Sequence, residues 1–408
     1  MQVLSLTLSG LLLVAALGLA VPVAVIVVQV MAAFAVCRPQ VTAQAGGEDS
    51  SPEPGAIAVL MPAHDEAAGI AAAIVAVRRE LRDGDRLLVV ADNCTDDTAA
   101  LARAAGAEVV ERADGVRRGK GYALDFGVRY LATSPPVVVV IVDADCIVNP
   151  GALRQLARQC VANGRPAQAL YLMRSPPGAL LKTRIAEFAW CVKNEVRALG
   201  FDRLGLPCQL MGSGMAFPWP VLAGARLASG HIVEDLELGL ELATSGMPPA
   251  FCPGALVTSV FPVSAAALAQ QRTRWEHGHL AVIAGAVPRL LGLALTKRRP
   301  LLAAMAIDVC VPPLAALVLM LSLLIAVSSV LFLVAGSGAA ALAVAAMSIA
   351  ALLAALMLAW HGFGRSIVTL AELASAPTYA IGKIPMYLKA ARNRQTEWIR
   401  TKRDDPGR

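Results

Sequence analysis

The sequence has little charge, and its longest apolar segment has none. Only 16% of the 408 residues are Asp, Glu, Lys or Arg, whereas 57% are hydrophobic, and residues 1–37 contain no charged side chain. Because about 20 apolar residues suffice to cross a bilayer, this stretch is long enough to span it. It lacks the basic leader and the small-residue cleavage site of a secretory signal, so we expect a retained membrane anchor.

Charge is scarce again in the C-terminal third. Between Leu301 and Trp360 the only charged residue is Asp308, which we place within a span. Residues 336–338, Gly-Ser-Gly, divide this run into two stretches, each long enough to cross a bilayer. Residues 366–390 are apolar only in patches. We expect them to lie in the membrane interface, because a fourth crossing would export the basic tail.

Basic residues flank all three predicted spans. They are Arg38 after the first span, residues 297–299 before the second, and Arg365 after the third. The positive-inside rule therefore predicts a multi-pass protein of a bacterial-type inner (plasma) membrane with its large domain in the cytoplasm. The net charge of +6 largely reflects these flanks and fits contact with anionic lipids. No patterned basic patch indicates nucleic acid.

The chain also lacks an internal repeat and any Cys-x-x-Cys pair among its eight cysteines. Most of these cysteines lie in the predicted cytoplasmic domain, where free thiols are the default. The expected organisation is an N-terminal transmembrane anchor, a Gly- and Pro-rich linker, an α/β domain, an interface helix, two transmembrane helices, and an interfacial helix with a basic tail. The predicted bounds are, in that order, 1–37, 38–56, 57–280, 281–300, 301–360 and 361–408.

Short apolar runs alternate with alanine-rich helical patterns in the predicted domain. The runs are Ala56–Met61, Arg86–Ala91, Ala107–Glu111 and Pro136–Val142. This alternation is typical of parallel βαβ units. In open sheets of this kind, ligands bind at the carboxyl ends of the strands.

Asp143 and Asp145 directly follow the most apolar of these runs. A buried strand that ends in two carboxylates places them at the ligand-binding edge of the sheet. A hard cation such as Mg²⁺ or Mn²⁺ needs oxygen ligands and uses few carboxylates when phosphates supply the others. The pair is therefore our candidate metal site, with a nucleotide diphosphate as the second partner.

From Ile57 to Trp275 the sequence resembles the family-two glycosyltransferases of GT-A fold, in the membrane-bound branch of cellulose, hyaluronan and exopolysaccharide synthases. Residues 62–66 match the family's Pro-x-Tyr-Asn-Glu loop, with His for Tyr and Asp for Asn, and residues 119–121 resemble its Gly-Lys segment. The resemblance implies an α/β domain with a mainly parallel, Rossmann-like sheet. It assigns nucleotide-sugar binding to Pro62, His64, Glu66, Asp92, Lys120, Asp143, Asp145 and Arg274, with Asp92 on the base and Lys120 on the diphosphate.

Glu234 and Asp235 resemble the Thr-Glu-Asp motif of polysaccharide synthases, with Val233 in place of the threonine. The resemblance makes Asp235 the catalytic base and Glu234 its neighbour in the site. Inverting transfer needs one carboxylate to deprotonate the acceptor hydroxyl as it attacks the anomeric carbon. The alternative interpretation is an ordinary acid-rich first turn of a helix.

Two further segments resemble the acceptor side of such enzymes. The Gly212, Ser213, Gly214 segment would allow close approach of a sugar. Gln271, Arg274 and Trp275 form a Gln-x-x-Arg-Trp cluster, in which the resemblance places Arg on the diphosphate and Trp under the acceptor sugar. The alternative for this Trp is an interfacial residue with basic neighbours.

The sequence thus predicts an inverting, metal-dependent hexosyltransferase that uses a nucleotide-diphosphate sugar, with UDP as the expected carrier. Three spans leave little material for a secretion channel, which favours a polyprenyl-diphosphate-linked oligosaccharide as acceptor. The Gln-x-x-Arg-Trp cluster instead favours processive extension of a polysaccharide, and the sequence leaves this choice and the oligomeric state open. A distant alternative is a membrane transporter or scaffold that binds nucleotide without turnover.

Overall fold

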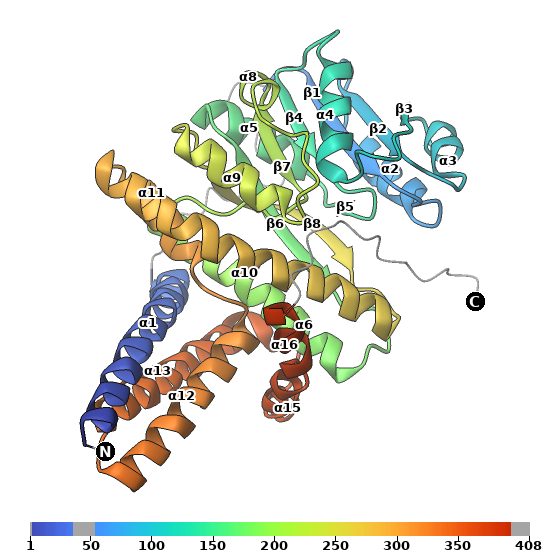
Figure 1. The fold of residues 1–408 in the computed structure, drawn as a ribbon. Coiled ribbons are helices and arrows are strands. Elements are labelled where there is room, and N and C mark those ends of the chain that lie inside the picture. The colour runs from blue at the N-terminus through green and yellow to red at the C-terminus, as the bar shows by residue number, and fades with distance from the viewer. Residues whose placement is uncertain (1, 36–53, 393–408) are drawn as a thin grey trace. The chain divides into compact units, whose positions relative to one another are not determined.

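The computed structural model describes residues 2–35 and 54–392 (Figure 1). By its internal contacts the chain forms two units. Of the described residues, the helical unit contains 2–35, 180–204 and 279–392, and the α/β unit contains 54–179 and 205–278. Arg38, most of the predicted linker and the basic tail beyond residue 392 lie outside the described residues.

Four parallel strands form the first half of the sheet in the α/β unit, in the order β3-β2-β1-β4. Their bounds are Ile57–Ala63 (β1), Arg86–Asp92 (β2), Glu108–Arg112 (β3) and Val138–Ile141 (β4). These strands match the four predicted apolar runs closely. The residues of β1, β2 and β4 are almost all buried, as expected for strands that helices cover on both faces, whereas the edge strand β3 is partly exposed.

The second half of the sheet is mixed, and the sequence patterns did not predict it. It continues β4-β7-β6-β8-β5, with strands Ile147–Val148 (β5), Ala167–Arg174 (β6), Met215–Pro218 (β7) and Ala250–Val260 (β8). β7 runs antiparallel to both β4 and β6, and β8 pairs in parallel with β6. The sheet is therefore parallel around the β1–β4 strands and mixed beyond them.

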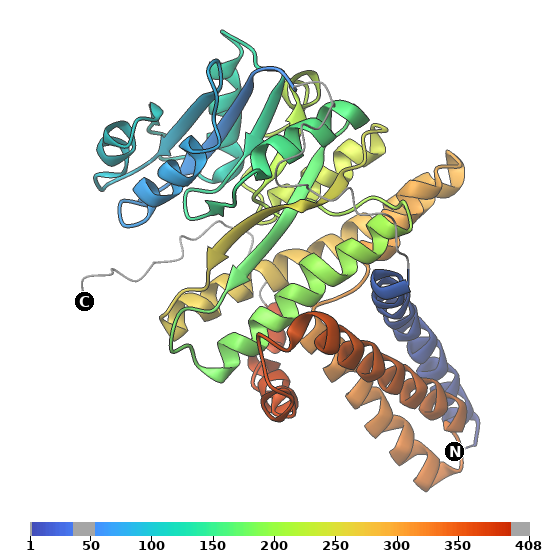
Figure 2. The ribbon, with the colours of Figure 1, turned by 180° about the vertical axis from the view of Figure 1, so that it is seen from behind.

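Helices cover both faces of this sheet. Figure 1 shows α4, α8 and α9 on one face, and Figure 2 shows α2 and α5 on the other. The first face encloses a core that includes Leu88, Leu131, Phe217 and Leu238. Full burial of each such side chain contributes roughly 1.5–3 kcal/mol. The bounds are Ile70–Arg78 (α2), Thr98–Ala104 (α3), Lys120–Leu131 (α4), Ala152–Asn163 (α5), Trp219–Ala223 (α8) and Glu234–Thr244 (α9).

The long apolar helices belong to the helical unit. In it α1 (Gln2–Ala35) packs against α12 (Leu314–Ala335) and α13 (Ala339–Ala359), with the small Ala16, Ala341 and Ala345 buried between them. Gly336 and Gly338 adopt left-handed backbone conformations, φ 64° and 90°, and turn the chain between α12 and α13. The predicted break at residues 336–338 is thus confirmed.

In the part of the chain that the structure describes, four helices are long and apolar enough to cross a membrane: Val3–Phe34, Ala266–Thr296, Leu314–Ala335 and Ala339–Gly364. This is one more than the three predicted crossings. The additional candidate is α10 (Ala265–Thr296), which is continuous across the predicted domain boundary at residue 280. The interfacial placement of residues 281–300 stays a prediction.

Asp308 does not lie within one of these candidate spans, contrary to the sequence-based expectation. It belongs to the short helix α11 (Pro300–Val309), where it is buried. Arg197 donates to Asp308 Oδ1 at 2.8 Å and to Gln29 Oε1 at 2.7 Å, and Gln29 Nε2 donates to Asp308 Oδ1 at 2.6 Å. The buried charges are therefore paired, as burial requires.

Arg197 ends a π-helical turn, η1 (Val192–Arg197), between α6 (Leu181–Cys191) and α7 (Ala198–Arg203). These helices follow β6 in the chain and precede β7, yet their contacts assign them to the helical unit. Gly200 on α7 leaves no room for a side chain, because a Cβ there would clash with the backbone of Gln29. Close backbone packing and the Gln29–Arg197–Asp308 network together join α1 to this inserted segment.

Residues 360–392 form a second π-helical turn and short helices. They are η2 (Trp360–Gly364), α14 (Leu370–Leu373), α15 (Ala376–Ile381) and α16 (Ile384–Arg392). None of the three α-helices reaches the length of about 20 residues that a crossing needs. A single spanning helix through residues 366–390 is thereby excluded, and their placement in the interface stays a prediction.

Candidate active site

Polar side chains gather where the parallel strands end. Along the strand order β3-β2-β1-β4, the residues at this edge are Arg112, Asp92, His64 and Asp143. The edge is the one at which parallel α/β sheets bind ligands. Parallel pairing therefore brings together residues that are far apart in the sequence.

Asp143 and Asp145 face a common point at this edge. Carboxylate oxygens of both residues and the sulfur of Cys146 lie within 4.8 Å of one another. Ser259 donates a hydrogen bond of 3.0 Å to Asp145 Oδ2, and Cys146 is buried against the hydroxyl of Tyr171. Two carboxylates suit a hard divalent ion whose remaining ligands are phosphate oxygens and water, so the residues present fit Mg²⁺ or Mn²⁺.

Lys120 is the cation at the centre of the site. Its Nζ lies 2.6 Å from Asp143 Oδ1 and 3.9 Å from Glu234 Oε1, and it donates to the carbonyl oxygen of Gly212 at 2.7 Å. Although burial lowers the pKa of Lys120, the carboxylates of Asp143 and Glu234 more than compensate and raise it above its ordinary value. Lys120 therefore stays charged, and it joins the end of β4 to the loop at Gly212 and to the start of α9.

Glu234 and Asp235 begin α9, so the predicted helical turn and the predicted site coincide. Burial is the largest effect on Glu234. It raises the pKa to about 7, with Lys120 opposing and Asp235 reinforcing the shift. Burial likewise raises the pKa of Asp143. The site thus holds several partly buried carboxylates around one lysine, an arrangement that is unfavourable unless cations or protons neutralise it.

The raised pKa of Glu234 predicts a pH-dependent cost to stability. A carboxyl group with a pKa of 4.5 when unfolded and about 7 when folded favours the folded state below pH 4.5, and this advantage is lost as the pH rises to 7. Glutamine mimics the protonated form at every pH. We therefore expect Glu234→Gln to have nearly the same melting temperature as wild type at pH 5. At pH 8 its free energy of unfolding should exceed that of wild type by up to about 3 kcal/mol.

Thermal melts of the detergent-purified proteins in EDTA measure this difference. Glu241→Gln, on the exposed side of the same helix, serves as the control and should show no such divergence. A stability difference between Glu234→Gln and wild type that is equal at both pH values contradicts the assigned pKa shift.

The Gly212–Gly214 segment contacts the same cluster. A Cβ on Gly212 would lie 3.3 Å from Asp235 Oδ2, and φ of Gly212 is +95°, a conformation that side chains rarely adopt. Gly214 (φ +67°) is fixed by packing, since a Cβ there would meet Ala169 at 2.6 Å. The Ser213 hydroxyl accepts a hydrogen bond from the Asp143 amide at 3.1 Å. Local structure thus explains Ser213 and Gly214, and only Gly212 lies beside the candidate base.

The first part of α10 carries the Gln-x-x-Arg-Trp cluster. Gly278 packs against Val233, the residue that precedes Glu234, because a Cβ on Gly278 would meet Val233 at 2.6 Å. One turn earlier, the charge of Arg274 interacts with the carboxylates of Glu234 and Asp143. Among the described residues, Arg274 Nε and Gln271 Oε1 are buried without a hydrogen-bond partner, and Trp275 is partly buried. A polar ligand would satisfy both unpaired atoms, and that of Arg274 belongs to a side chain whose charge interacts with the carboxylates.

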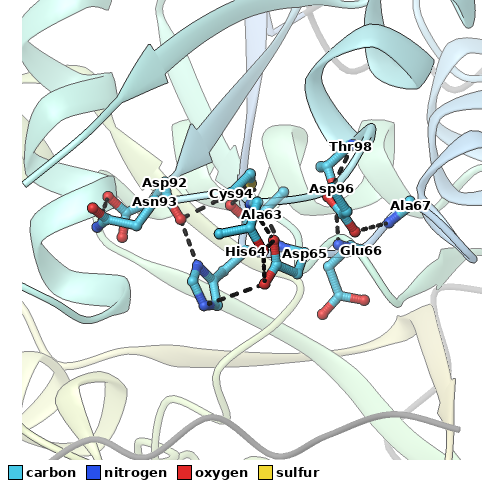
Figure 3. Close-up of polar contacts among 11 residues, drawn as sticks. Ala63, His64, Asp65, Glu66, Ala67, Asp92, Asn93, Cys94, Asp96 and Thr98 are labelled. Atoms are coloured by element: carbon cyan, nitrogen blue, oxygen red, sulfur yellow. Dashed lines mark hydrogen bonds and ion pairs between the residues drawn. The ribbon is translucent and has the colours of Figure 1, made fainter.

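Asp92, His64 and Glu66 form a separate group further along the edge (Figure 3). His64 Nδ1 lies 2.6 Å from the carbonyl oxygen of Asp92, and the Glu66 amide donates to Thr98 Oγ1 at 2.7 Å. Pro62, at the end of β1, is partly buried. The structure thus brings the predicted nucleotide-contacting residues of β1 and β2 together, while Lys120 and Arg274 join the carboxylate cluster instead.

Arg112 is a member of this edge that the sequence patterns missed. Its guanidinium forms an ion pair of 2.6 Å with the buried Asp92 and also contacts Asp114 at 3.0 Å. Register pairs Asp92 with Arg112 directly across β2 and β3. The sequence nevertheless indicates its position, because Arg112 is the first residue after the predicted run Ala107–Glu111. Asp92 likewise directly follows the predicted run Arg86–Ala91.

A second acidic group adjoins Asp92 and comprises Asp65, Cys94 and Asp96. Asp65 has a left-handed backbone (φ 50°), and its carboxylate accepts the Thr95 amide at 2.5 Å. Asp96 accepts the Thr98 amide at 3.0 Å at the start of α3, as expected of a residue beside a helix N-terminus. These carboxylates are used in holding the loops, and all seven described cysteines are free thiols.

Comparison with known proteins decides the family. Residues 54–278, more than half of the chain, match the family model described as "Glycosyltransferase like family 2". The chain belongs to glycosyltransferase family 2. An uncharacterized glycosyltransferase of Mycobacterium bovis is 38% identical over 104 residues, which are 26% of this chain and 43% of that protein. The glucosyl-3-phosphoglycerate synthase of Mycolicibacterium paratuberculosis is 43% identical over 101 residues, 23% of this chain and 29% of that protein.

The chain therefore spans less than half the length of these curated relatives. Among solved structures, it is similar to a mannosyltransferase from Pyrobaculum calidifontis in complex with GDP-Man and Mn²⁺, with a TM-score of 0.55 and 16% identity. That likeness covers 94% of this chain and 100% of the other, so it extends beyond the α/β domain. The predicted GT-A fold with added apolar helices is thereby confirmed, and the narrower synthase branch stays a prediction.

Proposed function

We propose that this family-2 protein is an inverting glycosyltransferase that moves a hexose from a nucleotide-diphosphate sugar to an acceptor hydroxyl. One observation supports this most strongly: Lys120, Asp143, Glu234 and Asp235 meet beside Gly212 at the ligand-binding edge of the sheet. The cluster combines two functions that the reaction requires. It offers carboxylates for a metal-bound diphosphate and a separate carboxylate for proton transfer.

Asp143 and Asp145 would hold Mg²⁺ or Mn²⁺, which when bound neutralises charge on the departing nucleoside diphosphate. Asp235, beside Gly212, would take the proton of the attacking hydroxyl. Arg274, whose Nε has no hydrogen bond among the described side chains, would donate to the diphosphate. Trp275 would lie under the acceptor sugar, with Gln271 beside it.

The other end of the edge would hold the nucleotide. His64 Nδ1 is engaged by the Asp92 carbonyl, which directs its other ring nitrogen away from that contact. Arg112 neutralises and orients Asp92. We infer that Pro62, His64, Glu66 and Asp92 contact the base and ribose, with UDP as the expected carrier. The mannosyltransferase of similar fold carries GDP-Man, so both nucleotides belong in the test.

For the acceptor we favour a polyprenyl-diphosphate-linked oligosaccharide of cell-surface polysaccharide synthesis. The four apolar helices support an enzyme that works at a membrane. With α10 lying in the interface, as we predict for residues 281–300, the basic residues 297–299 and Arg365 favour a cytoplasmic active site in an inner membrane. The alternative is processive synthesis, which the Gln-x-x-Arg-Trp cluster favours.

The deciding experiment is a transfer assay with membranes that contain the protein. A panel that includes UDP-glucose and GDP-mannose is supplied with Mn²⁺, and lipid-extractable and polymeric products are separated and weighed by mass spectrometry. We expect one lipid-linked product that is heavier by a single sugar. If no donor in the panel releases its nucleoside diphosphate, the proposed activity is wrong. A ladder of polymeric products supports the processive alternative.

A further inference from the structure

Lys120 contacts the metal-binding carboxylate itself. Its Nζ is 2.6 Å from Asp143 Oδ1, and its side chain is only 18% exposed. The same ammonium group donates to the Gly212 carbonyl, which leaves it little freedom to turn elsewhere. The lysine that the family resemblance assigns to the diphosphate is therefore bound to the residue that would hold the metal.

A dication bound by Asp143 and Asp145 would come close to this ammonium group. Like charges at such a distance repel each other strongly in a partly buried site, where water screens them poorly. Asp145 alone, already accepting a hydrogen bond from Ser259, would supply weak binding. Lys120 therefore opposes binding of a free divalent ion.

A nucleoside diphosphate changes this balance. Its phosphate oxygens supply negative charge to both the dication and the ammonium, so Lys120 can leave Asp143 for a phosphate while the metal takes the carboxylates. The two ligands then assist each other, and by linkage the assistance is equal in both directions. Departure of the ammonium also releases the Gly212 carbonyl, next to the candidate base Asp235.

We propose that Lys120 is a positioning residue that couples metal binding to donor binding. It keeps the Asp143 carboxylate in an ion pair until a nucleoside diphosphate binds. The inference rests on the proposed function. It adds an order of events: the metal enters with the donor, and the acceptor side of the site is freed only then. Free metal alone would leave Lys120 paired with Asp143.

The test is a titration of the detergent-purified protein with Mn²⁺, in which electron paramagnetic resonance measures the unbound ion with and without UDP. We expect UDP to tighten Mn²⁺ binding to wild type by about tenfold or more. In Lys120→Met, binding without UDP should tighten by about tenfold, and the effect of UDP should shrink to about threefold or less.

Arg129→Met provides the matched control, because it removes one positive charge from the same helix at a side chain that is 75% exposed. It should behave as wild type. Lys120→Arg keeps the charge and should keep weak binding without UDP and a large effect of UDP, even if the methionine variant folds poorly.

Unchanged or weaker nucleotide-free binding in Lys120→Met, with the effect of UDP undiminished, overturns the coupling while leaving the proposed enzyme intact. The same titration separates the two ideas. Wild type that binds no Mn²⁺ under either condition defeats the proposed metal-dependent transferase, and the coupling with it.

Discussion

Asp145→Ala is expected to abolish metal-dependent sugar transfer while the protein stays folded and inserted in the membrane. Asp145 supplies one of two carboxylates to the proposed metal, and it accepts hydrogen bonds from the side chains of Ser259 and Cys146. Losing several kcal/mol of charge stabilisation at the leaving diphosphate corresponds to a rate lower by about 10³-fold or more. Transfer assays across a range of Mn²⁺ concentrations measure the effect.

The controls for Asp145→Ala separate charge and packing from metal binding. Asp83→Ala removes a carboxylate from an exposed position of the same unit and should leave transfer unchanged. Ser259→Ala removes the hydrogen bond to Asp145 without removing the ligand, so a modest loss is expected. Near-normal transfer by wild type in excess EDTA would eliminate the metal role altogether.

Asp235→Asn is expected to slow transfer by about 10² to 10⁴-fold with donor binding nearly unchanged. Asparagine keeps the shape of the side chain beside Gly212 but cannot accept the proton of the acceptor hydroxyl. The variant also removes one negative charge from the surroundings of Lys120 and Asp143. Single-turnover assays measure the chemical step, and a titration with UDP and Mn²⁺ measures donor binding.

Glu241→Gln, two turns further along the same helix and half-exposed, is the matched control for Asp235→Asn. It should transfer sugar at the wild-type rate. If donor binding collapses in Asp235→Asn while the control is normal, Asp235 belongs to the nucleotide site and another group must be the base.

The parallel half of the sheet could be predicted because its signal is local. Each of the four runs is short, three of them are followed directly by a charged residue, and the strands buried on both faces have the apolar composition that such burial needs. The same rule located Asp92 and Asp143 at the carboxyl edge, and it would have located Arg112 had it been applied to the third strand. The turn at residues 336–338 could also be predicted, since glycine tolerates the left-handed backbone of that turn.

The mixed half depends on pairings between distant segments. β7 lies between β4 and β6 although β6 and the helices of residues 180–204 precede it in the chain. No local pattern specifies such neighbours, and β5 is only two residues long. The apolar run around Asp308 was misread as part of a span for a related reason: hydropathy measures composition, whereas the paired burial of Asp308 with Arg197 and Gln29 depends on three segments.

What the sequence determined by itself is therefore the chemistry available: a glycosyltransferase-like set of carboxylates, a lysine, and an Arg-Trp pair beside apolar helices. Tertiary structure alone decided which of these residues meet. Lys120 was expected at a phosphate, but it contacts Asp143 and Gly212, and Glu234 is partly buried beside it. Charge–charge energies fall with distance and rise with burial, and sequence spacing encodes neither quantity for groups that strands and loops bring together from across the chain.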